Sequence, residues 1–277
     1  MMALGKLGGR EPNYHSDCDV VFLYDHDGET DGSNKTSNSH FFNELSRRII
    51  KLTTGIGVHG RLYEMDGSLR ASHQHAPLAI SLHDYDEYLN SGEVPYWQYQ
   101  GMCKARVIYG HSISRQTVEA SVREALLHCP SKDLIAREIH QTRIELERGA
   151  SARNLKRGVG GTMDVEFIVQ SLQLRHALDH PEILVTGTLD AIKILTATGL
   201  LSDDDGQLLE KTYEFLRSIE SGLRLMDTLD RHDIPESLGQ LEQLAFLLGY
   251  DSSQALVTVC DRCRRENRAR FTHLVSK

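Results

Sequence analysis

Hydrophobic and polar positions follow different periods in the two parts of this chain. Residues 20–24 form an uninterrupted apolar run, which is typical of a buried β-strand. Residues 61–66 alternate between apolar and polar, and glycines bound them on both sides, which indicates a second strand. Apolar residues recur at helical spacing over residues 41–52 and 96–107, which predicts two helices. The first part of the chain is therefore expected to mix strands and helices.

From about residue 114 onward, the only periodic signal is helical. Aspartates at positions 203–205 favour a helix start there, because acidic side chains stabilise the first turn. We therefore expect an α+β chain, with a small mixed-sheet domain over residues 1–112 and an all-α helical bundle over residues 113–277. The helices predicted for the bundle cover residues 134–148, 164–178, 188–198, 203–229, 238–248 and 254–275.

Composition narrows the possible functions. The 277 residues carry a net charge of −8 with no dominant basic stripe, which disfavours a dedicated nucleic-acid binder. No apolar run approaches the roughly 18–20 residues needed to cross a bilayer, so we expect no membrane span. The five cysteines are sparse and odd in number, which favours a reducing cytoplasm over a disulfide framework.

A glycine-rich run at residues 5–9 precedes Asp17 and Asp19, which stand at the head of the first strand. Residues two apart on a strand point to the same face, so the two Cβ atoms would lie roughly 6.5–7 Å apart. Asp66 ends the second predicted strand and can face the pair if the strands are neighbours. Carboxylates in this arrangement suit Mg²⁺ and phosphoryl transfer, and glycines let a backbone approach phosphate closely. The alternative is that the aspartates are solvated turn residues.

Gly5-Lys6, ten intervening residues and Asp17-x-Asp19 resemble the signature of the nucleotidyltransferase superfamily. Longer segments in the same order resemble the glutamine synthetase adenylyltransferase (glutamate–ammonia-ligase adenylyltransferase) family. These segments are Gly5–Glu11, Ser16–Leu23, Tyr63–Arg70, Ala105–Gly110 and Gly160–Gln170.

The resemblance implies a role in nitrogen metabolism. The family has two related halves, each a nucleotidyltransferase domain followed by a helical domain. One half transfers AMP from ATP to a tyrosine of glutamine synthetase, and the other removes that AMP with phosphate. A PII signalling protein and glutamine regulate the balance. The form of the motif around Asp164 is more similar to the C-terminal, adenylylating half, and we expect the first domain to be incomplete at its N-terminus.

Carried over to this sequence, the resemblance assigns Asp17 and Asp19 to Mg²⁺ and Asp66 to both the metal site and the catalytic base. The residues it assigns to the nucleotide are Gly5, Lys6, Gly8, Gly9, Ser16 and Arg70.

One segment departs from the family pattern. Relatives have Arg-Leu-Arg-Pro-Ser-Gly after the third aspartate, whereas residues 68–73 read Ser-Leu-Arg-Ala-Ser-His. Loss of an arginine weakens the recognition of phosphate. Two alternatives therefore stand beside AMP transfer. One is phosphorolytic deadenylylation of glutamine synthetase, and the other is a catalytically impaired fragment that binds a protein partner through its helical half.

Two groups of basic residues invite a functional interpretation. Lys156 and Arg157 precede three glycines, and they would either contact phosphate or form a solvated loop. The last predicted helix carries five arginines between residues 262 and 270, which would either face an acidic protein partner or be solvated.

Overall fold

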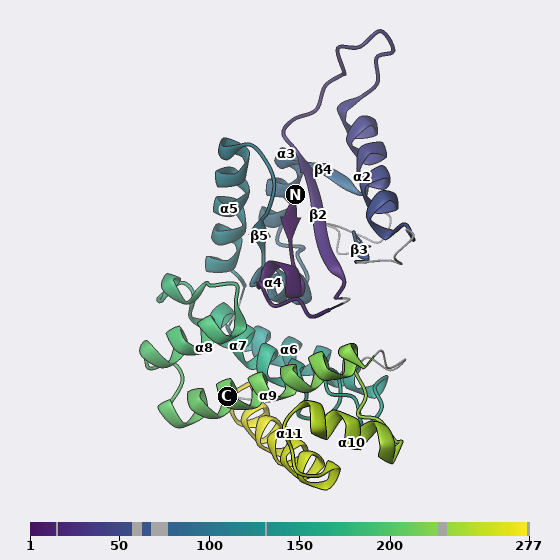
Figure 1. The fold of residues 1–277 in the computed structure, drawn as a ribbon. Helices are drawn as coiled ribbons and strands as arrows, with labels where there is room; N and C mark the ends of the chain where they lie inside the picture. The colour runs from purple at the N-terminus through teal and green to yellow at the C-terminus, as the bar shows by residue number, and fades with distance from the viewer. Residues whose placement is uncertain (15, 57–62, 68–76, 131, 227–231, 276–277) are drawn as a thin grey trace. The chain divides into compact units, whose positions relative to one another are not determined.

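The computed structural model describes residues 1–14, 16–56, 63–67, 77–130, 132–226 and 232–275. Contacts divide the chain into two compact units (Figure 1). The first comprises Met1–Pro130 together with Leu184–Gly187, and the second comprises Ser131–Ile183 with Thr188–Lys277. The chain is thus α+β, with a small mixed sheet and many helices. The division falls near residue 130, beyond the boundary of 112 expected from the sequence.

A small mixed sheet organises the first unit. Its strand order is β3-β2-β1-β5, and β4 also pairs with β2. The strands β1 (Met2–Ala3) and β5 (Arg106–Val107) are antiparallel neighbours, and β1 is also antiparallel to β2 (Cys18–Tyr24). The strands β3 (Met65–Asp66) and β4 (Ala79–Ser81) run parallel to β2. All the named strands precede residue 108.

Alternating side chains of β2 form the core of this unit. Val20, Phe22 and Tyr24 are buried together on one face, as expected for a strand against a helix layer. The helix α2 (Asn38–Thr54) packs against β3 and β4, and its Phe42 stacks on Tyr24 with 5.1 Å between ring centroids. The hydroxyl of Ser37 accepts a hydrogen bond from the amide of His40 and so caps the start of α2. The helix predicted over 41–52 is confirmed.

The described residues of the first unit form four further helices: α1 (Gly5–Gly8), α3 (Leu82–Asn90), α4 (Tyr96–Met102) and α5 (Ser112–Leu127). The helix predicted over 96–107 is wrong at its end. After Met102 the amides of three successive residues, 103–105, each donate to the carbonyl three residues earlier, and Val107 then pairs with Met2 in the sheet. A β-branched, buried residue at the end of an apolar run suits a strand better than a helix.

The second unit is helical throughout its named elements. They are α6 (Lys132–Arg148), α7 (Thr162–His176), the 3₁₀ turn η1 (Pro181–Ile183), α8 (Thr188–Ala197), α9 (Asp203–Leu225), α10 (Leu238–Leu247) and α11 (Ser253–Val275). The six helices predicted for this part are confirmed within a few residues. The hydroxyl of Ser202 accepts a hydrogen bond from the amide of Asp205 and so caps α9.

An apolar cluster of the second unit joins α9, α10 and α11. It is built from Leu216, Ile219, Leu223, Leu244 and Leu256, with Cys260 beside them. Cys260 and Cys263 are buried on α11. Among the helices that the structure describes, none is long and apolar enough to cross a membrane.

Candidate functional site

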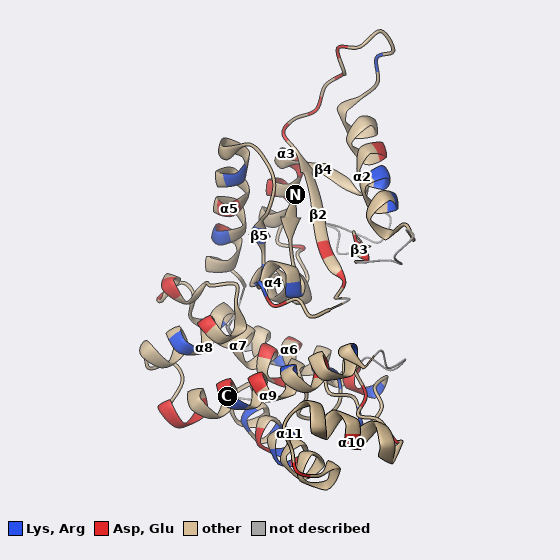
Figure 2. Cartoon of the chain, viewed as in Figure 1, with Lys and Arg blue, Asp and Glu red and all other residues tan. Residues whose placement is uncertain are grey.

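Two of the three predicted aspartates lie opposite each other on neighbouring strands. Asp19 of β2 is in register with Asp66 of β3, and the amide of Cys18 donates to the carbonyl of Glu64 at 2.7 Å. Paired strands lie about 4.8 Å apart, so the two carboxylates project from the same face of the sheet as neighbours. Asp17 precedes β2 by one residue and is exposed. Figure 2 shows acidic residues at the start of β2, beside β3.

The glycine run forms a short helix, α1, that contacts the Asp19 carboxylate. Gly5 has a φ of +52°, which residues with a side chain rarely adopt. A Cβ atom on Gly5 would lie only 2.1 Å from Oδ2 of Asp19. The amide of Leu4 also donates to the Asp19 carbonyl at 3.0 Å. Only glycine therefore lets the turn lie directly against the carboxylate.

Arg106 fixes the other side of the same turn. Its Nε donates to the Gly8 carbonyl at 3.0 Å and its Nη2 donates to the Leu7 carbonyl at 2.8 Å. Burial lowers the pKa of Arg106, and the charge of Arg10 lowers it further. A Cβ atom on Gly8 would lie 1.9 Å from the Lys104 carbonyl, so the chain before β5 packs directly on α1.

An ion pair closes the end of the glycine run. Nζ of Lys104 donates to Glu11 at 3.0 Å, and both side chains are largely buried. A Cβ atom on Gly9 would lie 3.0 Å from the carbonyl of Thr186. Sequence reasoning gave no role to Arg106, Lys104 or Glu11. The sequence resemblance included the segment Ala105–Gly110, which contains Arg106. It gave no indication that this arginine binds the carbonyls of the glycine run.

The remaining predicted nucleotide-binding residues have different surroundings. The side chain of Ser16 is buried, and its Oγ accepts a hydrogen bond from the Asn13 amide at 2.8 Å. Lys6 lies in α1 and is half-buried. Arg70 lies outside the residues that the structure describes, as does the altered segment 68–73. The structure thus places Gly5, Lys6, Gly8 and Gly9 in one turn, next to Asp19.

Burial and the carboxylates at this site affect the pKa of the Cys18 thiol. Burial raises the pKa of Cys18, and the carboxylates of Asp19 and Asp17 raise it further. The thiol at the head of β2 is therefore held in its neutral form by burial and by two neighbouring carboxylates.

The donor set fits a magnesium ion through two carboxylates. Within the described residues, no group of three or more histidine, cysteine, aspartate or glutamate side chains is close enough together to hold a metal. Mg²⁺ commonly uses only one or two protein carboxylates and fills its other positions with water and substrate phosphates. The neighbours Asp19 and Asp66 meet that requirement, whereas the structure does not bring Asp17 into a group of three.

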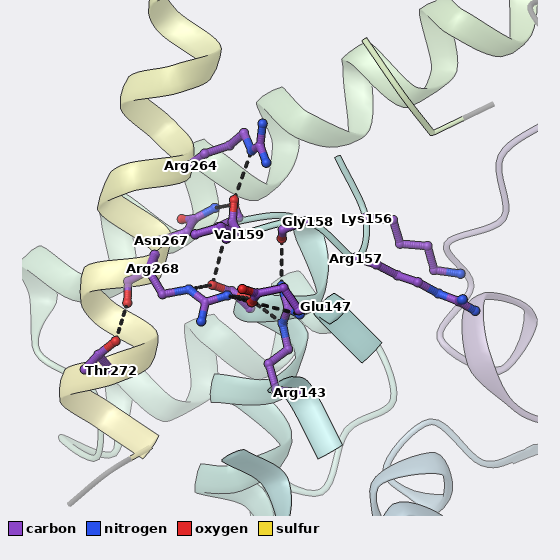
Figure 3. A network of polar contacts seen from close by, with 12 residues as sticks. Arg143, Glu147, Lys156, Arg157, Gly158, Val159, Arg264, Asn267, Arg268 and Thr272 are labelled. Carbon is purple, nitrogen blue, oxygen red and sulfur yellow. Dashed lines mark hydrogen bonds and ion pairs between the residues drawn. The ribbon is translucent and has the colours of Figure 1, made fainter. Parts of the chain in front are cut away.

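The helical unit contains a second cluster of charges, which is centred on two buried residues. Arg143 and Asp164 are both fully buried and are joined by a bond of 2.5 Å from Nε to Oδ1. Nε of Arg268 lies 2.9 Å from Oδ2 of Asp164, and Glu147 pairs with both arginines (Figure 3). Burial raises the pKa of Asp164, and the two arginines offset part of that effect. Glu166, two residues along α7, instead accepts from the Tyr213 hydroxyl at 3.0 Å.

Two family models match the two parts of this chain. The family model described as glutamate-ammonia ligase adenylyltransferase matches residues 1–121. The model described as GlnD PII-uridylyltransferase matches residues 133–275. Together they cover most of the described chain, and the first contains both neighbouring aspartates.

Curated relatives carry the name bifunctional glutamine synthetase adenylyltransferase/adenylyl-removing enzyme. The protein of Bordetella pertussis is 34% identical over 269 residues, which is 91% of this chain and 28% of the relative. The protein of Aromatoleum aromaticum is 31% identical over 99% of this chain and 29% of its own length. That of Neisseria meningitidis serogroup A is 29% identical over 100% of this chain and 31% of its own length. The chain thus spans under a third of these relatives, and it belongs to the glutamate–ammonia ligase adenylyltransferase family.

Proposed function

We propose that the first unit is a nucleotidyltransferase domain that transfers AMP from ATP to a tyrosine of glutamine synthetase, and that the helical unit follows it as a bundle domain. The observation that supports this most directly is the register of Asp19 with Asp66 beside a turn where only glycine fits. The names of the relatives support the acceptor protein. The match to residues 1–121 supports the class of reaction.

In this proposal the chain's own residues bind ATP and move one proton. The glycine turn lies against the triphosphate, with Lys6 as a point charge and Ser16 and Arg70 as further phosphate contacts. The tyrosine oxygen attacks the α-phosphorus, the bond from that phosphorus to the bridging oxygen breaks, and pyrophosphate leaves. Asp66 accepts the tyrosine proton. Asp19 and Asp66, together with Asp17, would hold Mg²⁺, which would supply positive charge to the phosphates.

A direct test uses the full chain, glutamine synthetase, MgCl₂ and ATP labelled on the α-phosphate. Asp19→Asn keeps the shape of the side chain and removes its charge, and Asp25→Asn is the matched control at the exposed end of β2. We expect Asp19→Asn to lower transfer at least about a hundredfold, since even outer-shell changes at metal sites cost ten- to a hundredfold. Activity that survives EDTA, or equal activity in the two variants, would contradict the proposal.

A second reaction has support from the relatives, whose names include adenylyl removal. Phosphorolysis at the same carboxylates would release ADP from modified glutamine synthetase in the presence of phosphate. Measuring ADP formation with and without phosphate separates this reaction from AMP transfer. A binding module without turnover would instead hold glutamine synthetase in both the wild type and Asp19→Asn.

Regulation by a PII signalling protein is a further part of the proposal. Its support is that residues 133–275 match a model described as a PII-uridylyltransferase. Titrating PII into the transfer assay tests it, and an unchanged rate at saturating PII would refute it. We also propose the cytoplasm as the compartment, which the five free cysteines support.

A further inference from the structure

A glycine-rich loop of the helical unit is held in one conformation by side chains from three helices. We call residues 154–161 the basic loop. The carbonyls of Gly158, Val159 and Gly160 accept hydrogen bonds at 2.7–3.2 Å from side chains of α6 and α11. The donors are Arg143, Arg264 and Asn267. The amide of Gly160 donates to Asp164 of α7 at 3.1 Å. Three consecutive carbonyls are thus each fixed by a side chain.

Close packing adds to these bonds. Gly160 has a φ of +69°, and a Cβ atom there would lie 1.8 Å from the Arg264 carbonyl. Cβ atoms at Gly158 and Gly161 would lie 2.3 and 2.5 Å from the carbonyls of Asn154 and Leu155. Each glycine therefore lets backbone approach backbone. The backbone of the basic loop is therefore tightly packed, whereas a solvated loop was one of the two interpretations that the sequence allowed.

The basic loop presents two cations that have no ion-pair partner in the described part of the chain. The charge network around Asp164 pairs Arg143 and Arg268 with Asp164 and Glu147, so its four charges balance. Lys156 is half-buried and Arg157 is exposed. Within the described residues, neither side chain makes an ion pair or a hydrogen bond. Figure 3 shows the two side chains next to each other, directed away from the network.

The backbone of the loop argues against a phosphate cradle. Loops that bind phosphate do so with free amide groups. Here the amides of Lys156 and Arg157 already donate to Oδ1 of Asn154, at 3.1 and 2.7 Å. What the loop offers is two cationic side chains and Val159, whose surface is 46% exposed. A combination of arginine with exposed apolar surface is typical of protein interfaces.

We propose that the basic loop docks an acidic segment of the protein substrate. This inference rests on the proposed function, which supplies glutamine synthetase as that substrate. The packed loop fixes the backbone at Lys156 and Arg157 before binding, so only their side chains lose conformational freedom when they meet carboxylates. Three arginines of α11 already have partners within the helical unit. Arg264 donates to the Val159 carbonyl, Arg268 pairs with Asp164, and Arg270 pairs with Asp205.

The test compares two double variants of the full chain. Lys156→Gln with Arg157→Gln removes both loop charges, and Arg262→Gln with Arg265→Gln removes two exposed charges elsewhere on the same unit. Loss of two exposed ion pairs should raise the KM for glutamine synthetase roughly five- to tenfold, with the KM for ATP unchanged. The control pair should change neither. The difference should shrink at about 1 M salt, where the Debye length is about 3 Å.

Direct binding of glutamine synthetase, measured by biolayer interferometry without ATP, separates this inference from the proposed reaction. If the wild type binds but transfers no AMP, the proposed function fails and the docking proposal is decided by the binding of the loop variant. Equal binding by the loop variant and the control would overturn the docking proposal. A rise in the KM for ATP alone would also overturn it, and would assign the loop to the nucleotide. No binding by the wild type refutes it as well.

Discussion

Replacing Gly5 by alanine should inactivate the carboxylate site while leaving the fold almost intact. A side chain at a left-handed backbone position costs about 1–2 kcal/mol. The new Cβ would lie 2.1 Å from Oδ2 of Asp19, and ordinary contact begins at 3.4 Å, so one of the two atoms must move by the difference of about 1.3 Å. A displacement of about 1 Å at reacting groups costs on the order of a hundredfold in rate.

Gly92 provides a matched control for the backbone cost. Its φ is +76°, and a Cβ atom there would meet nothing within 4 Å. Gly92→Ala therefore carries the same backbone penalty without touching a carboxylate. For a chain of this size, a cost of 1–2 kcal/mol lowers Tm by about 2–8 °C. We expect both variants to fall in that range in calorimetry, and only Gly5→Ala to lose AMP transfer.

The two measurements together decide whether this reasoning holds. Equal transfer rates in Gly5→Ala and Gly92→Ala would show that the contact with Asp19 does not matter for the chemistry. A much larger loss of Tm in Gly5→Ala would show that the glycine serves the fold of the sheet rather than the carboxylate. Either result would refute the role assigned to the turn.

Three further changes test other parts of the molecule. Arg106→Lys keeps the charge but cannot donate hydrogen bonds to both carbonyls of the glycine turn. The loss of one charged hydrogen bond, about 1.5 kcal/mol, should raise the KM for ATP about tenfold. The control Arg115→Lys should leave the KM for ATP unchanged. Asp19→Asn removes a charge that raises the pKa of Cys18, so iodoacetamide should label Cys18 faster at a given pH. Peptide mass spectrometry measures the labelling rate. A rate equal to that in Asp25→Asn would contradict this expectation. Arg143→Met leaves Asp164 buried without its closest partner, so it should lower the free energy of unfolding in urea by about 3–5 kcal/mol. The double variant Arg143→Met with Asp164→Leu should lower it by less. Equal losses in the single and double variants would contradict this expectation.

The periodic parts of the fold were predictable from the sequence because their signals are local. The apolar run of β2 and the helical spacing of α6–α11 each lie within one segment. Three helices of the first unit, α1, α3 and α5, were not predicted, although α3 and α5 carry local signals. Val118, Val122 and Leu126 of α5 are buried at intervals of four, and the Ser81 hydroxyl accepts from the Asp84 amide at the start of α3.

The strands β1, β4 and β5 could not be predicted, because strands of two or three residues carry no usable period. Their identity depends on partners far away in sequence, as when Val107 pairs with Met2. The candidate site likewise combines residues that local sequence patterns reveal with contacts that only the fold creates. The spacing of Asp17 and Asp19 is visible in the sequence, and the neighbouring position of Asp66 depended on the pairing of β3 with β2. The bonds from Arg106 to the glycine turn follow from tertiary packing and leave no mark in the sequence.

The central position of β1 affects how the first unit acquires its structure. Met2 pairs with Val21 on one side and with Val107 on the other. The sheet is therefore complete only when segments about a hundred residues apart have met, and loop closure over such a distance slows folding. During synthesis, β1 and β2 can pair early, but one edge of β1 stays open until β5 emerges. An open strand edge is a site for pairing between chains, so a ribosome that stalls before Val107 would expose an aggregation-prone intermediate.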